Sequence, residues 1–225
     1  MKVLAISDVI VETLYSPALR EVARDVELVI SCGDLPSAYL EYIVSLLDVP
    51  LYYVMGNHGA RGGSREFPEG CINLDGRVVN QNGLLLAGLE GSLRYNDAPR
   101  YQYTENEMRA KIAYLSRYLW LNRMRYGRFL DVLVTHAPPF GIQDASDPAH
   151  HGFKSLLGFI DRFHPDYLIH GHTHLYDNRA VRQSVRGHTL IINAYGYLLL
   201  DIPKPGGNGK QEERNQDLEK QHDTF

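Results

Sequence analysis

Aspartate, asparagine and histidine residues recur at the ends of short apolar runs in this sequence. Five of these runs are each followed by one or two such residues, which are Asp8, Asp34, Asn57, His58, His136, His172 and His174. Carboxylate, amide oxygen and imidazole together suit Mn, Fe, Zn or a similar divalent ion, and no thiolate belongs to the set. We therefore predict that these residues form a site for one or two divalent metal ions.

The local motifs are individually weak and collectively strong. A Gly33-Asp34 pair after a strand is common in ordinary turns, and Gly56-Asn57-His58 or Gly171-His172-Thr173-His174 also occur without a metal. Each motif here follows a separate apolar run, and the carboxyl ends of strands are where ligands gather in open α/β sheets. Chance does not readily explain this ordered series.

The ligand types indicate a reaction class as well as a metal. Two divalent ions about 3.5–4 Å apart can bind a phosphoryl oxygen and lower the pKa of a bridging water. Asp34 is the residue best placed in the sequence to bridge two ions. His58 stands beside a ligand without being needed as one, so it can protonate a leaving oxygen or stabilise transition-state charge.

The elements that must position these residues alternate between strand and helix patterns. We expect strands at Lys2–Ser7, Glu27–Ser31, Leu51–Val54, Arg77–Asn80, Leu84–Leu89, Asp131–Thr135, Tyr167–His170, Val181–Val185, Thr189–Asn193 and Tyr197–Ile202. We expect helices at Ser16–Arg24, Ala38–Leu47, Thr104–Arg125 and Phe153–Phe163. Asn82-Gly83 predicts a tight hairpin, Thr104 with Glu107 predicts a capping box, and Gly91–Tyr103 is expected to be a polar loop. The pattern indicates one α/β domain with a mixed sheet or two packed sheets.

Composition restricts the class of protein. The chain has 225 residues, 44% of them hydrophobic, and a formal net charge of −4. This balance is that of a globular domain and argues against nucleic acid or an anionic membrane as the partner. We predict one domain over residues 1–202 and a flexible polar tail over 203–225, no membrane span, and a cytoplasmic location. The two cysteines, Cys32 and Cys71, are expected to be buried free thiols, and homo-oligomerisation is left open.

At these residues the chain resembles the calcineurin-like metallophosphoesterases, and a small bacterial branch of that family in the segment 135–142. The motifs that match are Gly33-Asp34, Gly56-Asn57-His58, His136 and Gly171-His172-Thr173-His174, and the resemblance extends over residues 1 to about 202. It implies a four-layer α-β-β-α sandwich with two packed mixed sheets. By position it assigns Asp8, Asp34 and His174 to a first metal, and Asp34, Asn57, His136 and His172 to a second. His58 becomes the acid or transition-state stabiliser.

The sequence departs from the family pattern at two positions. Ile10 stands where the family has a histidine ligand, and isoleucine cannot coordinate a metal. Gly59 stands where the family has an acid that orients the histidine equivalent to His58, and loss of such a contact can lower activity or metal affinity about 10–100-fold. Glu12 lies near enough in sequence to be considered as a replacement ligand for the first site.

The resulting hypothesis is a hydrolase of phosphodiesters or phosphomonoesters that acts on a small-molecule phosphate ester. Arg94, in the polar loop, and His151, after Pro139, are candidate substrate contacts, although both side chains also fit an ordinary exposed surface. Two alternatives remain. Ile10 and Gly59 fit a metal-binding scaffold that has lost catalysis, and the arginine-rich helix Thr104–Arg125 fits, less well, a nuclease.

Overall fold

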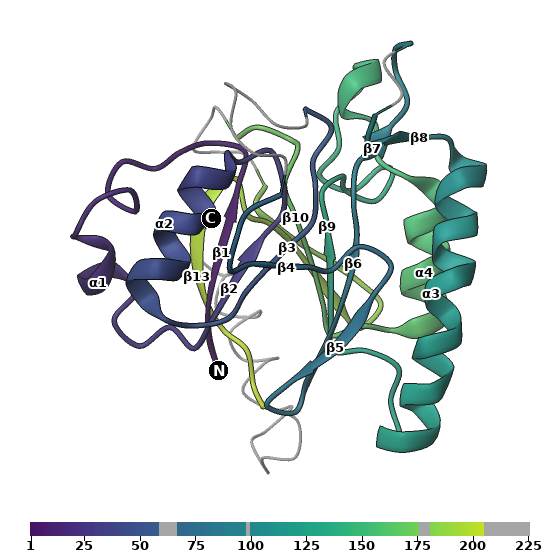
Figure 1. The fold of residues 1–225 in the computed structure, drawn as a ribbon. Helices are drawn as coiled ribbons and strands as arrows, with labels where there is room; N and C mark the ends of the chain where they lie inside the picture. Colours follow the sequence, from purple (N-terminus) through teal and green to yellow (C-terminus); the bar gives the residue numbers. More distant parts are fainter. Residues whose placement is uncertain (59–66, 98–99, 176–180, 205–225) are drawn as a thin grey trace, which may run out of the picture.

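The computed structural model describes residues 1–58, 67–97, 100–175 and 181–204. Two large mixed sheets face each other (Figure 1). The first sheet contains, in spatial order, β13 (Gly196–Asp201), β1 (Lys2–Ser7), β2 (Leu28–Ser31), β3 (Leu51–Tyr53) and β4 (Ile72–Asn73). The second contains β11 (Gln183–Arg186), β12 (Thr189–Asn193), β10 (Tyr167–His170), β9 (Val132–Thr135), β6 (Leu84–Leu89) and β5 (Val78–Gln81).

Parallel strands form the centre of each sheet, and an antiparallel strand lies at one edge of the first sheet and at both edges of the second. In the first sheet β1, β2, β3 and β4 are parallel and β13 pairs antiparallel with β1. In the second, β12, β10, β9 and β6 are parallel and the edge strands β11 and β5 are antiparallel. Because neighbouring parallel strands point the same way, the segments that leave them meet at one edge of each sheet.

Helices cover the outer face of each sheet (Figure 1). The first sheet carries α1 (Leu19–Val22) and α2 (Ser37–Leu47), and the second carries α3 (Glu105–Tyr126) and α4 (Lys154–Phe163). A 3-10 turn, η1 (Pro148–His150), precedes α4, and β7 (Ser92–Leu93) pairs with β8 (Gln102–Tyr103) in a separate two-stranded sheet. The predicted four-layer α-β-β-α sandwich is confirmed.

Three apolar clusters fill the spaces between these layers. Val3 and Ile30 of the first sheet pack with Leu86, Val134 and Ile169 of the second. Two further clusters lie outside the sheets, one beneath α1 and α2 and one beneath α3 and α4. The central strands are therefore buried on both faces, which explains why they read as continuous apolar runs rather than alternating ones.

Two local sequence signals appear as predicted. Asn82 and Gly83 both have positive φ, 50° and 93°, in the hairpin between β5 and β6. At the start of α3, the Thr104 side chain accepts from the backbone N–H of Glu107, and the Glu107 side chain accepts from the backbone N–H of Thr104. Both cysteines are free, as predicted; Cys32 is buried, but Cys71 is half-buried, contrary to expectation.

Other expectations need correction. The helix expected at Ser16–Arg24 is helical only at Leu19–Val22, because hydrogen bonds to the carbonyls of residues 16 and 17 follow the tighter i→i+3 pattern. The strand expected at Val181–Val185 lies at Gln183–Arg186, and the polar loop Gly91–Tyr103 contains β7 and β8. Almost all of the predicted tail, residues 205–225, lies outside the described residues. Among those that are described, no helix combines the length and apolar character needed to cross a bilayer.

Candidate metal centre

The predicted ligands lie just beyond the carboxyl ends of five strands. Asp8, His136 and the Gly171–His174 segment follow β1, β9 and β10 without a gap. Asp34 follows β2 by three residues, and Asn57 follows β3 by four. Both sheets therefore contribute ligands, and strand order alone brings together side chains that are up to 166 positions apart in sequence.

Three of these residues have unusual backbone conformations. Asp8, Asp34 and His172 have φ values of 68°, 58° and 68°, in the left-handed region that residues other than glycine rarely occupy. Such conformations cost free energy and persist where the surrounding structure enforces them, often at functional sites. Here they turn each side chain sharply away from its strand direction.

A glycine allows the two sheets to meet at this point. Gly33 has a φ of 101°, and a Cβ atom there would lie 2.6 Å from the backbone nitrogen of Gly56 and 2.7 Å from Nδ1 of His136. Real Cβ contacts are not this short. Gly33 therefore lets the loop after β2 pack directly against the loop after β3 and against His136.

His136 is fully buried and lies against two other predicted ligands, Asn57 and Asp34. Its Nδ1 lies 2.7 Å from the carbonyl oxygen of Cys32, and its Nε2 lies 2.9 Å from Oδ1 of Asn57 and 3.5 Å from Oδ2 of Asp34. A histidine that binds a metal commonly donates its other ring N–H to a carbonyl, which fixes the ring. Cys32 thus holds His136 so that Nε2 points at the two oxygen ligands.

Electrostatics couples this histidine to Asp34. Burial acts to lower the pKa of His136, but the charge of Asp34 and the hydrogen bond to it outweigh burial and raise the pKa to about 9. Burial acts to raise the pKa of Asp34, and His136 together with His58 outweighs it, so the pKa falls below its ordinary value. In the metal-free protein a proton on Nε2 therefore lies between the oxygens of Asn57 and Asp34. A cation at the same point would replace that proton.

Asp8 and His172 form the other half of the centre. The backbone N–H of His172 donates to both carboxylate oxygens of Asp8, at 3.1 and 3.0 Å, and burial raises the pKa of Asp8. Nε2 of His172 lies 2.7 Å from the carbonyl oxygen of Ala149, and burial lowers the pKa of His172 well below its ordinary value. A neutral ring that donates from Nε2 keeps the lone pair of Nδ1 for a metal. Nε2 of His174 lies 3.9 Å from Oδ1 of Asp8.

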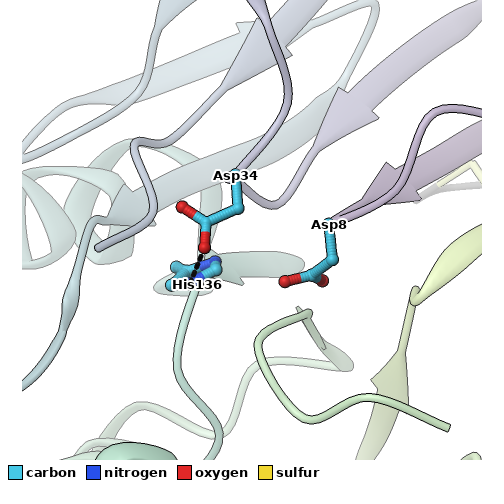
Figure 2. A group of neighbouring side chains, drawn as sticks. All are labelled: Asp8, Asp34 and His136. Carbon is cyan, nitrogen blue, oxygen red and sulfur yellow. Dashed lines mark ion pairs between the residues drawn. The ribbon is translucent and has the colours of Figure 1, made fainter. Parts of the chain in front are cut away.

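The two halves are close enough to share bound ions. One ligand atom from each of Asp8, Asp34 and His136 lies within 4.8 Å of the others, and the three side chains point toward one another (Figure 2). Two buried carboxylates so close together repel each other, so a cation between them is electrostatically favourable. The donor set of oxygens and imidazole nitrogens fits a divalent transition metal. The residues present therefore fit a metal centre.

His58 lies at the edge of this centre. Its backbone N–H donates to Oδ1 of Asp34 at 3.1 Å, while its Nε2 lies 3.7 Å from Oδ2 of the same carboxylate. The side chain is 46% exposed, in contrast to the fully buried His136. His58 can therefore reach a substrate from outside while its backbone is fixed by a predicted metal ligand.

The two predicted substrate contacts have other partners. Nη2 of Arg94 binds both carboxylate oxygens of Glu107, at 3.1 and 3.0 Å, and the carbonyl oxygen of Gln102. Nε2 of His151 lies 3.0 Å from the carbonyl oxygen of Ser146, and its ring stacks on Phe140. Each of these side chains therefore has a local contact in the structure.

Two neighbours of the centre were missed from the sequence. The hydroxyl of Tyr95 accepts from Nδ2 of Asn57 at 3.1 Å, which turns Oδ1 of Asn57 toward His136. The ring of His150 lies against those of His172 and His174, with centroids 5.1 and 5.9 Å apart. Neither residue belongs to a recognisable motif. The one sequence signal is that each residue is adjacent to a candidate substrate contact, Tyr95 to Arg94 and His150 to His151.

Of the two positions that depart from the family pattern, the structure describes only Ile10. Ile10 lies in the loop after Asp8 and is 45% exposed. An apolar side chain therefore occupies the position of a ligand. Gly59 lies outside the described residues. Glu12, considered as a replacement ligand, is exposed and does not belong to the group of Asp8, Asp34 and His136 whose ligand atoms lie within 4.8 Å of one another.

Comparison with known proteins assigns this chain to a protein family. Residues 1–176 match the family model Metallophos, described as calcineurin-like phosphoesterase. The match covers well over half of the chain, and it includes every predicted metal ligand. The protein therefore belongs to the calcineurin-like phosphoesterase family.

Individual relatives are distant. A curated protein of Caenorhabditis elegans, UPF0046 protein K07C11.7, is 38% identical over 64 residues, which is 28% of this chain and 21% of that protein. The match therefore spans about one fifth of that relative. A Vps29 variant from Entamoeba histolytica has 14% identity and a TM-score of 0.45, covering 91% of this chain and 87% of that one. A predicted phosphoesterase from Streptococcus pneumoniae has 14% identity and a TM-score of 0.34, covering 87% and 72%. With TM-scores this low, the structural similarities add nothing to the assignment.

Proposed function

We propose that this protein is a metal-dependent hydrolase of small-molecule phosphate esters, either diesters or monoesters. The observation that carries the proposal is the convergence of Asp8, Asp34 and His136 within 4.8 Å, at an edge where both sheets end. Family membership supports the same reaction class. The proposed ligand set is Asp8, Asp34, Asn57, His136, His172 and His174, with Asp34 as the bridge if two ions bind.

The roles that we propose for the buried and the exposed side chains follow from their burial. When bound, one or two divalent ions would supply positive charge for phosphoryl oxygens and lower the pKa of a water. The buried side chains, His136 above all, hold ligand atoms in place and exclude solvent. The exposed ring of His58, fixed through its backbone to Asp34, donates a proton to the leaving oxygen or a hydrogen bond to the developing charge.

Hydrolysis of two model substrates tests the proposal. Purified protein loaded with Mn²⁺ would be assayed on bis-p-nitrophenyl phosphate and on p-nitrophenyl phosphate, with Zn²⁺ and Fe²⁺ as alternative metals. We expect turnover on at least one substrate. We also expect His58→Ala to lower kcat by roughly 100-fold to 10,000-fold, the range for loss of a general acid, while Mn²⁺ affinity stays within about twofold because its backbone contact to Asp34 remains.

A matched histidine variant controls for nonspecific effects. His188 lies in the exposed turn between β11 and β12 and belongs to no part of the centre, so His188→Ala should retain full turnover. Absence of turnover with every metal, in protein that is folded and binds metal, would defeat the hydrolase proposal.

A metal-stabilised binding scaffold is the second candidate. The specific observation in its favour is Ile10, whose side chain cannot supply the ligand that the family pattern places there. A scaffold needs the buried ligands but not the exposed imidazole of His58. It therefore predicts that metal raises the melting temperature while His58→Ala changes no measurable property, whereas the hydrolase proposal predicts the loss of turnover described above.

A further inference from the structure

The segment that contains η1 is fixed directly to the metal centre. Asp147 begins the turn, and its Oδ1 accepts from the backbone N–H groups of Ala149, at 3.1 Å, and His150, at 3.3 Å. The carbonyl oxygen of Ala149 is in turn 2.7 Å from Nε2 of His172. A side-chain cap and a contact to a proposed ligand thus hold this short segment at the edge of the site.

His150 faces the centre from this segment. Its ring lies 5.1 Å from that of His172 and 5.9 Å from that of His174, measured between centroids. The carboxylate oxygens of Asp147 lie 2.9 and 3.0 Å from Nδ1 of His150. Because Asp147 occupies Nδ1, the other ring nitrogen, Nε2, is the one that can serve a ligand. The side chain is 35% exposed, so a ligand can approach it from solvent.

The adjacent histidine is directed elsewhere. Nε2 of His151 lies 3.0 Å from the carbonyl oxygen of Ser146, and its ring stacks on Phe140 with centroids 6.2 Å apart. His151 is the substrate contact predicted from the sequence, but the geometry favours His150. The Asp147–His150 pair, defined as these two side chains, is therefore the element of this loop that faces the metal centre.

We infer that the Asp147–His150 pair binds the phosphoryl group of the substrate. His150 donates a hydrogen bond from Nε2 to a phosphoryl oxygen, and Asp147 fixes the ring through Nδ1. His58 approaches the centre from the side of Asp34, and His150 approaches it from the side of His172 and His174. The imidazoles of His58 and His150 thus flank the position that a phosphate would occupy. This inference rests on the proposed function, because the metal centre is what brings a phosphate there.

Titration calorimetry with inorganic phosphate tests the inference without relying on turnover. Phosphate would be titrated into Mn²⁺-loaded wild type and into His150→Ala and His150→Gln. Loss of one hydrogen bond to a charged group should weaken phosphate binding roughly 10-fold or more in His150→Ala. The amide of glutamine can still donate, so His150→Gln should retain part of the affinity. The melting temperature of each variant would confirm that it is folded.

Asp147→Asn separates positioning from contact. The amide oxygen of asparagine can still accept from the N–H groups of residues 149 and 150, so the turn is kept while the carboxylate at Nδ1 is lost. We expect an affinity for phosphate between those of wild type and His150→Ala. His188→Ala, in the exposed turn between β11 and β12, should bind phosphate like wild type.

Three results would overturn the inference. The first is unchanged phosphate affinity in His150→Ala. The second is a larger loss in His151→Gln than in His150→Gln, which would place the contact on the neighbouring ring. The third is a tenfold loss of Mn²⁺ affinity in His150→Ala, which would make His150 a metal ligand rather than a phosphate contact. Phosphate binding that depends on His150, in a protein that hydrolyses nothing, would instead leave the inference standing and defeat the proposed function.

Discussion

Replacement of Gly171 by alanine should damage the junction between the two sheets. Gly171 precedes His172 directly, and a Cβ atom there would lie 2.5 Å from Oδ2 of Asp8 and 2.7 Å from the Cβ of Ser7. Carbon atoms in contact are ordinarily about 3.5–4.0 Å apart, so the ends of β1 and β10 would have to separate by about 1 Å. Overpacking of this kind costs about 1–3 kcal/mol.

The assay is urea unfolding of the metal-free protein, followed by Mn²⁺ titration. We expect the Gly171→Ala variant to unfold at a lower urea concentration with an unchanged m value. We also expect weaker Mn²⁺ binding, because the added methyl group displaces the carboxylate of Asp8 from the centre. Turnover should fall about 100-fold, the effect of misplacing catalytic groups by about 1 Å.

Gly158 provides a matched control. It lies within α4, and a Cβ atom there would meet no other atom within 4 Å. Gly158→Ala should therefore stabilise the protein by about 0.5–1 kcal/mol, the usual gain from removing a glycine inside a helix. Wild-type stability and wild-type Mn²⁺ affinity in Gly171→Ala would refute the claim that close approach of the sheets requires this glycine.

Three further predictions concern the ligands and the fold. Ile10→His should raise the Mn²⁺ affinity or the number of ions bound, as measured by calorimetry. Ile72→His, at another exposed isoleucine, should change neither. Equal effects of the two substitutions would show that position 10 does not lack a metal ligand. In metal-free protein the pKa of His136 is raised from 6.5 to about 9, so its protonation stabilises the fold fully below pH 6.5. The free energy of unfolding should therefore fall as pH rises from 6.5 through about 9. The lowered pKa of Asp34 acts in the opposite sense: the stability that its carboxylate contributes is lost as pH falls below 3.8. A free energy of unfolding that is flat across both pH ranges would contradict the coupling of His136 to Asp34. Thr104→Ala removes the N-cap of α3 and should cost about 1 kcal/mol in urea unfolding while Mn²⁺ affinity stays unchanged; an altered Mn²⁺ affinity would show that α3 is coupled to the metal centre.

Local chemistry made much of the fold predictable. Asn82 and Gly83 can adopt positive φ, and Thr104 with Glu107 can satisfy the first free N–H groups of a helix, so each signal acts within a few residues. The central strands were predictable because burial on both faces leaves unbroken apolar runs. The short strand β4, Ile72–Asn73, has two residues and no periodicity to detect. Its pairing with β3 is a property of the assembled sheet.

The candidate site was predictable where a ligand follows a strand, and not where a loop folds back. Asp8 and His136 occupy positions fixed by β1 and β9, so the sequence could place them once the strands were assigned. His150 reaches the centre because the carbonyl of Ala149 bonds His172 across 23 positions. Tyr95 reaches Asn57 across 38 positions. Contacts of this kind depend on tertiary packing and leave no local pattern.

The most direct test of the metal centre is a crystal structure of Mn²⁺-loaded protein with anomalous diffraction data. We expect at least one anomalous peak in contact with both Asp34 and His136, at ligand distances of about 2.0–2.2 Å. Data from crystals with one and two equivalents of Mn²⁺ would show whether Asp8 and His174 hold a second ion. Carboxylates and imidazoles that bind no ion at saturating Mn²⁺, or that turn away from one another, would contradict the proposed metal centre.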